Sequence, residues 1–225
     1  LGMAEAHNFF VDYRGGLSSR PGFQFCELIK SDTLDTRMTR FAFSPDIENT
    51  YVVLFGDEYI RFLQDGSYVL EDPLTITGIT QASPAVVTSV AHGLSNGQWV
   101  KLAAVAGMTQ VNGRTFKIAG VTANTFQLVD PLTDANIDST NYTAYVSAGT
   151  ASAIYGIVSP YAAAQLSGLV FDQYRDYIRI TSRDDLPQHD LVRAGHIDWS
   201  ISETVISPYV AGPTITGHSS MRSTG

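Results

Sequence analysis

The chain has 225 residues, of which 44% are hydrophobic and only 16% charged, and its formal net charge is −8. This length supports a sizeable core or two small domains, and the acidic balance argues against nucleic-acid binding by phosphate neutralisation, which needs clustered Lys and Arg. We expect no membrane span, because no apolar run reaches the roughly 18 residues that one requires, and no signal peptide, because residues 1–10 lack a basic region and an apolar stretch.

The first 74 residues predict a β-meander. One or two helical turns are expected over residues 2–10, before a turn-rich segment at 14–22 whose glycines supply positive φ. Apolar and polar side chains then alternate as in strands, and Asp65-Gly66 is a hairpin signal. The strands are expected at residues 23–29, 38–44, 51–55, 58–63 and 68–70.

Residues 75–154 form a neutral block, with three basic and three acidic side chains, whereas residues 1–74 carry −6 and residues 155–225 carry −2. Short strands separated by Gly- and Asn-centred turns are typical of a small barrel or sandwich. These strands are expected at residues 75–80, 86–90, 99–102, 115–118, 125–129 and 142–146. We expect the threonine-rich segments 75–80 and 148–154 to bring the two ends of the block together, as an inserted domain requires.

After the block, Ser159-Pro160 predicts the start of a short helix over residues 161–171. Strands are expected at residues 176–182 and 196–206, with one helical turn at 187–193. From Pro208 on, Gly, Ser, Thr and Pro dominate, and the last ten residues have no reason to fold alone.

We therefore predict a mainly β fold with a discontinuous, β-rich outer domain that has few short helices. Residues 1–74 form its first part, and residues 155–225 form its second part with a flexible C-terminal tail. A small β-barrel or sandwich, residues 75–154, interrupts it. The outer domain, rather than the insert, is expected to determine the function.

Catalytic motifs are missing from the sequence: it has no GxSxG elbow, phosphate loop or HExxH. The densest polar cluster could form a metal site from His189, Asp190 and His196, but Gly195 disfavours the continuous helix that would align the two histidines. A solvated loop is the favoured interpretation. We predict no metal and no cofactor.

A pair of carboxylates such as Asp172 and Asp176 is the arrangement that glycoside hydrolysis uses, but sequence cannot place the two groups across a cleft. Ordinary surface charge is the favoured interpretation, so we predict that the protein is not an enzyme and assign no catalytic or binding residue. Trp99 and Trp199 are expected to be core or interface anchors. The single cysteine, Cys26, excludes an intramolecular disulfide and is expected to be buried.

The outer segments resemble the N-terminal region of tail nozzle proteins of short-tailed phages, also called tail tubular protein B or tail hub proteins. The matching features, in chain order, are Gly15-Gly16, Arg20-Pro21-Gly22, a phenylalanine-containing strand ending at Ser44, the strand from Tyr51 to Gly56, Tyr59-Ile60-Arg61, Pro160-Tyr161, Leu191, Arg193 and Trp199. The resemblance implies a ring-forming virion protein, usually a hexamer, docked below the portal-adaptor complex. DNA passes through its channel without specific binding. It also implies a place in the virion tail, after assembly in the host cytoplasm.

The insert resembles the FCCH-like β domain, which is named after a region of ubiquitin-activating enzymes and recurs in phage tail proteins. The matching residues are His92-Gly93-Leu94, Gly97, Val100, Gly107-Met108, Asn112-Gly113, Phe116 and Thr122-Ala123-Asn124-Thr125-Phe126. No ubiquitin chemistry is carried over. The insert could pack against a neighbouring subunit, decorate the exterior or bind glycans.

The function expected from these observations is that of a structural tail protein that assembles around the DNA exit channel. The first alternative is a carbohydrate-binding or host-adhesion module of a virion. The second is a tail hydrolase that uses Asp172, Asp176 and Asp185.

Overall fold

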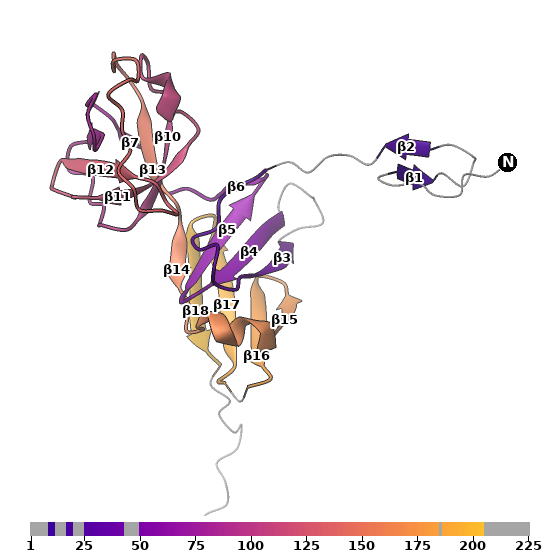
Figure 1. Cartoon of the computed structure of the whole chain (residues 1–225). Coiled ribbons are helices and arrows are strands. Elements are labelled where there is room, and N and C mark those ends of the chain that lie inside the picture. Colours follow the sequence, from indigo (N-terminus) through magenta and orange to yellow (C-terminus); the bar gives the residue numbers. More distant parts are fainter. Residues whose placement is uncertain (1–8, 12–16, 20–24, 43–49, 185, 205–225) are drawn as a thin grey trace, which may run out of the picture.

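Two β bodies lie side by side in the computed structural model, which describes residues 9–11, 17–19, 25–42, 50–184 and 186–204 (Figure 1). One body is built from the neutral block. The other is built from chain segments on both sides of it. The fold is therefore mainly β, as predicted.

The neutral block forms a seven-stranded antiparallel sheet with the order β7-β13-β10-β11-β12-β9-β8. Its strands, in chain order, are β7 (Leu74–Thr75), β8 (Gly78–Ile79), β9 (Val86–Thr88), β10 (Trp99–Ala103), β11 (Thr115–Ala119), β12 (Thr125–Val129) and β13 (Thr150–Ala153).

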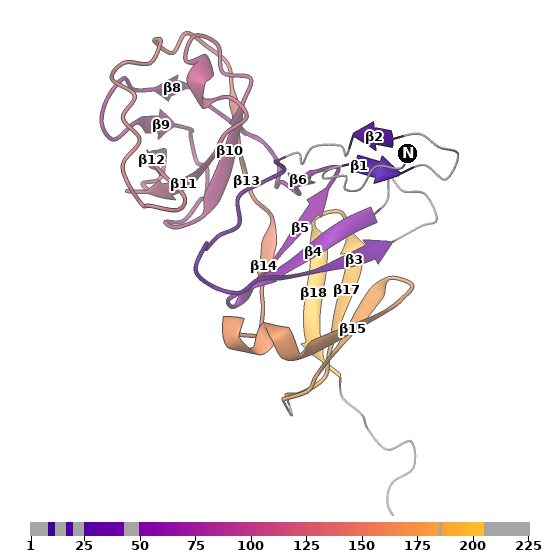
Figure 2. The ribbon, with the colours of Figure 1, turned by 45° about the vertical axis from the view of Figure 1, so that its right-hand side comes forward.

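This sheet closes into a barrel because its two end strands, β7 and β8, are consecutive in the chain. Between them, the Ile76 N–H donates to Gly149 O at one end of the sheet (3.0 Å), and the Thr77 N–H donates to Thr88 O at the other (2.9 Å). The rounded body is visible in Figure 2. Closure leaves the sheet without a long free edge.

Every second side chain of the barrel strands points inward, and these side chains fill the barrel. On β11 and β12, Phe116, Ile118, Phe126 and Leu128 are fully buried, while the residues between them are less buried. Their side chains meet Met108 and others in one hydrophobic core. The alternation of apolar and polar residues in the sequence therefore predicts which side chains form the core of the barrel.

The second body is a sandwich of two antiparallel sheets that face each other (Figures 1 and 2). The first sheet has the order β14-β5-β4-β3, with β6 paired to β5. Its strands are β3 (Arg37–Ala42), β4 (Thr50–Gly56), β5 (Tyr59–Gln64), β6 (Ser67–Tyr68) and β14 (Gly156–Val158). The second sheet runs in chain order through β15 (Leu169–Tyr174), β16 (Tyr177–Ser182), β17 (His189–Gly195) and β18 (Asp198–Glu203).

The core of the sandwich takes buried residues from both sides of the barrel, from Phe41 to Val69 and from Tyr161 to Trp199. Trp199 lies at its centre: its ring stacks on Phe62 at 4.2 Å between centroids and meets Phe41 edge-on at 4.9 Å. Segments far apart in sequence thus bury their apolar surface together.

The chain enters and leaves the barrel through adjacent strands, as the threonine-rich segments predict. Strands β7 and β13 pair in the register Thr150↔Thr75. The connection continues into the sandwich, where the Glu71 N–H donates to Ala153 O at 2.8 Å. The chain therefore enters and leaves the barrel at one place beside the sandwich.

Helical structure in the described residues is limited to two 3-10 segments, η2 (Thr109–Val111) and η3 (Ala163–Gly168). Of the helix predicted over residues 161–171, residues 163–168 are helical as η3, but the prediction is wrong for the last three residues, which begin β15 and pair with β16. The helical turn predicted at 187–193 is also wrong, since β17 is a central strand of its sheet. In both cases pairing partners outweigh local propensity. The described helical segments do not meet the length and hydropathy needed to cross a lipid bilayer.

Three other local predictions fail. Residues 9 and 10 belong to β1 (Phe9–Val11), which pairs with β2 (Leu17–Ser19), while residues 2–8 lie outside the described part. Residues 25–29 are irregular because their polar groups bind β6 and the barrel instead of a neighbouring strand. Residues 142–146 form a loop whose tyrosines pack against the barrel core.

Candidate functional site

The residues of the alternative metal site lie apart. His189 is the first residue of β17 and His196 follows its last, so the strand, at about 3.3 Å per residue, separates them by roughly 20 Å. His189 Nδ1 lies 3.0 Å from the Tyr161 hydroxyl, and His196 Nδ1 lies 2.9 Å from the Tyr51 hydroxyl. Asp190 accepts two hydrogen bonds from Arg179, at 2.9 and 3.2 Å, which lower the pKa of its carboxyl. In the described residues no group of three such side chains could hold a metal ion.

The two described acids of the hydrolase alternative are exposed. Asp172 is exposed on β15, opposite Arg179 in the sheet register, and Asp176 is exposed in the following turn. Asp185 lies outside the described residues.

Of the predicted anchors, Trp199 is in the sandwich core and Trp99 is buried at the junction of the two bodies, with 4% and 2% of their surfaces exposed. The prediction of a buried cysteine is wrong, since Cys26 is exposed. It lies in the irregular segment 25–29, where no strand alternation turns its side chain inward.

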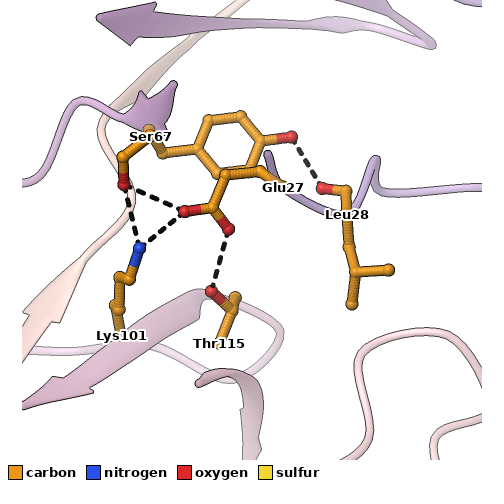
Figure 3. A network of polar contacts seen from close by, with 6 residues as sticks. Glu27, Leu28, Ser67, Lys101 and Thr115 are labelled. Carbon is orange, nitrogen blue, oxygen red and sulfur yellow. Dashed lines mark hydrogen bonds and ion pairs between the residues drawn. The ribbon is translucent and has the colours of Figure 1, made fainter. Parts of the chain in front are cut away.

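The most developed polar cluster of the described residues joins the two bodies (Figure 3). Glu27 Oε1 lies 2.6 Å from Lys101 Nζ on barrel strand β10 and accepts a hydrogen bond of 2.9 Å from Ser67 Oγ on sandwich strand β6. Lys101 Nζ also donates to Ser67 Oγ at 2.9 Å. Thr115 on β11 lies 3.5 Å from the second Glu27 oxygen. One carboxylate thus binds both bodies, and only 8% of its side chain is exposed.

The same junction holds a buried cation. Arg61 on β5 is 8% exposed, and its guanidinium lies 4.3 Å from the ring centroid of barrel Trp99, 5.2 Å from that of Tyr68 and 5.4 Å from that of Tyr59. Its cross-strand partner is Gly156, where an added Cβ would lie 2.8 Å from Ile60 O and 3.3 Å from the Arg61 stem. The absence of a side chain at Gly156 therefore makes room for the arginine. Aromatic faces attract such a cation, most strongly where water is excluded.

The electrostatics of the junction follow from this burial. Desolvation, with the nearby Arg61 charge next in size, lowers the pKa of Lys30. Desolvation also raises the pKa of Tyr59 and of Tyr68, against the opposing effect of Arg61. In this arrangement Glu27 and Lys101 both bind the Ser67 hydroxyl across the junction. What it does is fix the barrel against the sandwich.

Sequence reasoning missed Glu27, Lys101 and Arg61. Two signals were present: Lys101 is one of three basic residues in the neutral block, and Arg61 interrupts an otherwise apolar strand. Neither signal identifies the residue that the side chain contacts, because that residue comes from a distant segment of the chain.

Burial raises the pKa of Tyr161 to about 12. The unfolded chain ionises this residue near pH 10, so its contribution to stability is complete below pH 10 and falls as the pH rises towards 12. We expect Tyr161→Phe to flatten that decline in urea unfolding curves measured across this range. Tyr174→Phe is the control, since Tyr174 is 57% exposed. An unchanged slope in Tyr161→Phe would contradict the assignment.

Comparison with known proteins supports the resemblance of the barrel. Residues 82–154 match the family model of the ubiquitin-activating enzyme E1 FCCH domain, which is less than half of the chain. None of the curated proteins matches the chain.

Proposed function

We propose that this chain is a structural component of a phage tail of the nozzle or hub type. In this role it assembles with its own copies into a ring around the DNA exit channel, below the portal-adaptor complex. The observation that carries the proposal is the shared core of the sandwich, because it unites the two segments whose sequences resemble tail nozzle proteins.

The residues that carry the resemblance lie in the core of the sandwich or connect its two sheets. Tyr51, Tyr161, Leu191 and Trp199 are all buried in the shared core. Arg193 donates a hydrogen bond of 3.3 Å to the Tyr51 hydroxyl across the two sheets. These residues build a scaffold, which is what an assembly protein needs from them.

The charge distribution supports the same role. Residues 1–74 and 155–225 carry all of the excess acid, and the block between them is neutral. Carboxylates that line a channel would repel DNA phosphates and let the genome slide without adhering. The neutral barrel, held rigidly by Glu27 and Lys101, is suited to packing against a neighbouring subunit or to decorating the ring.

The test is the assembly state of the purified protein, measured by sedimentation across a concentration series and by electron microscopy. Closed rings, hexameric by the family resemblance, are the expected result. A variant that lacks residues 75–154, with the chain rejoined across the adjacent ends, separates the roles of the barrel: rings that persist make it decoration, and rings that are lost make it a subunit contact. A protein that stays monomeric both alone and with the other tail proteins would refute the proposal.

A carbohydrate-binding module remains the second candidate, and one observation favours it. Tyr174 is exposed at the β15–β16 turn, with the Tyr177 ring 5.8 Å away between centroids. Trp99 and Trp199, which would be stronger stacking platforms, are both buried. Selective binding on a glycan array that Tyr174→Ala abolishes would favour this candidate over the first.

A further inference from the structure

A groove of about 500 Å³ runs between the sandwich and the barrel. Strands β5 and β14 form one wall, and the residues just before β10 form the other. The lining includes Lys30, Tyr59, Arg61, Gln98 and Trp99. The lining contains two basic side chains, Lys30 and Arg61, beside two acidic ones, Glu58 and Glu71.

Two buried atoms of this lining have no hydrogen-bond partner within the described residues: Arg61 Nη1 and Trp99 Nε1. Both are donors only, so just an acceptor can satisfy them. Arg61 and Trp99 are each more than nine-tenths buried. Because a buried donor without a partner is costly, two of them along one groove indicate an acceptor that binds there.

The charge balance points the same way. No carboxylate of the described residues forms an ion pair with Arg61, although buried charges are ordinarily paired. Glu58 and Glu71 also line the groove and would disfavour a second negative charge on a ligand. The site therefore suits an acceptor that carries a single negative charge. A carboxylate meets this condition, and its two oxygens match the paired N–H groups of a guanidinium.

We propose that the groove between the barrel and the sandwich binds a carboxylate. Arg61 supplies the charge, and Trp99 Nε1 supplies a further hydrogen bond. The carboxylate can belong to a small acid or to an acidic side chain of a second copy of this chain. The proposal does not depend on the function proposed above.

The test follows the indole N–H resonances of the two tryptophans by NMR during an acetate titration at constant ionic strength. The Trp99 resonance, assigned with Trp99→Phe, is expected to move downfield and to saturate. The Trp199 resonance should stay in place, since its N–H already donates to His196 O at 3.3 Å. If chloride or inorganic phosphate shifts Trp99 as strongly as acetate, or if acetate moves both resonances equally, the carboxylate site is refuted.

A matched pair of variants checks the role of Arg61. Arg61→Gln should weaken acetate binding about tenfold or more, because a hydrogen-bonded charge pair is lost. Arg40→Gln removes the same charge from an exposed position and should leave binding unchanged. Equal binding by Arg61→Gln and the native chain would refute the proposal. Should Arg61→Gln fail to fold, the comparison of acetate with chloride on the native chain still decides.

Protein concentration separates the two sources. When a second copy supplies the carboxylate, the Trp99 resonance shifts with concentration before acetate is added, and acetate competes with that shift. When a small acid is the ligand, dilution leaves the resonance in place and only acetate moves it.

Discussion

Replacing Trp199 with alanine should destabilise the sandwich by about 3–5 kcal/mol, the usual cost of removing a large buried aromatic side chain. Trp199 is 4% exposed and contacts Phe41, Tyr51 and Phe62 through its ring. These partners lie on β3, β4 and β5, whereas Trp199 lies on β18, so the substitution leaves a cavity between the two sheets.

The barrel should stay folded in this variant, because its hydrophobic core shares no residue with the core of the sandwich. Thermal unfolding by calorimetry, with near-ultraviolet circular dichroism as a second probe, is expected to separate into two transitions with only the sandwich transition lowered. Phe126→Ala is the reciprocal control: Phe126 is fully buried in the barrel, so that variant should lower only the barrel transition. If both variants lower one common transition by the same amount, the two bodies fold as a single unit.

Replacing Glu27 with alanine should cost about 2–3 kcal/mol and loosen the barrel from the sandwich. Removing one partner of a fully buried ion pair costs about 3–5 kcal/mol, and the Lys101 side chain here keeps 22% of its surface exposed. The variant also removes the acceptor for Ser67 and Thr115. The free energy of unfolding measures the loss, and backbone NMR relaxation measures whether the two bodies then tumble independently.

Asp134→Ala provides the matched control within the same protein. It breaks the Lys117–Asp134 ion pair, which has the same separation of 2.6 Å but leaves 30% and 62% of the two side chains exposed. Exposed pairs contribute about 0–1 kcal/mol. Equal losses in the Glu27 and Asp134 variants would show that the buried ion pair does not hold the junction together.

Local prediction succeeded where strand alternation is the only local signal and failed where a helix signal precedes a strand. The strands around Val53, Ile60, Phe116 and Phe126 follow from alternation and from the turns between them. By contrast, residues 169–171 look helical after Ser159-Pro160, yet they extend because β16 supplies a complete set of partners. The failure therefore lies in tertiary pairing and not in the periodicity of the residues.

The sequence by itself determined that this chain is mainly β, that a neutral block interrupts it, and that this block resembles an FCCH-like domain. Those properties follow from the alternation of apolar and polar residues, from turn residues and from local composition, all of which depend only on residues that are close in sequence. Only the tertiary structure decided that Glu27 would meet Lys101, 74 residues away, and that Arg61 would lie against Trp99. These contacts join side chains from distant segments, so no local pattern encodes them: the role of each charged or aromatic side chain depends on the residue that the fold places opposite it.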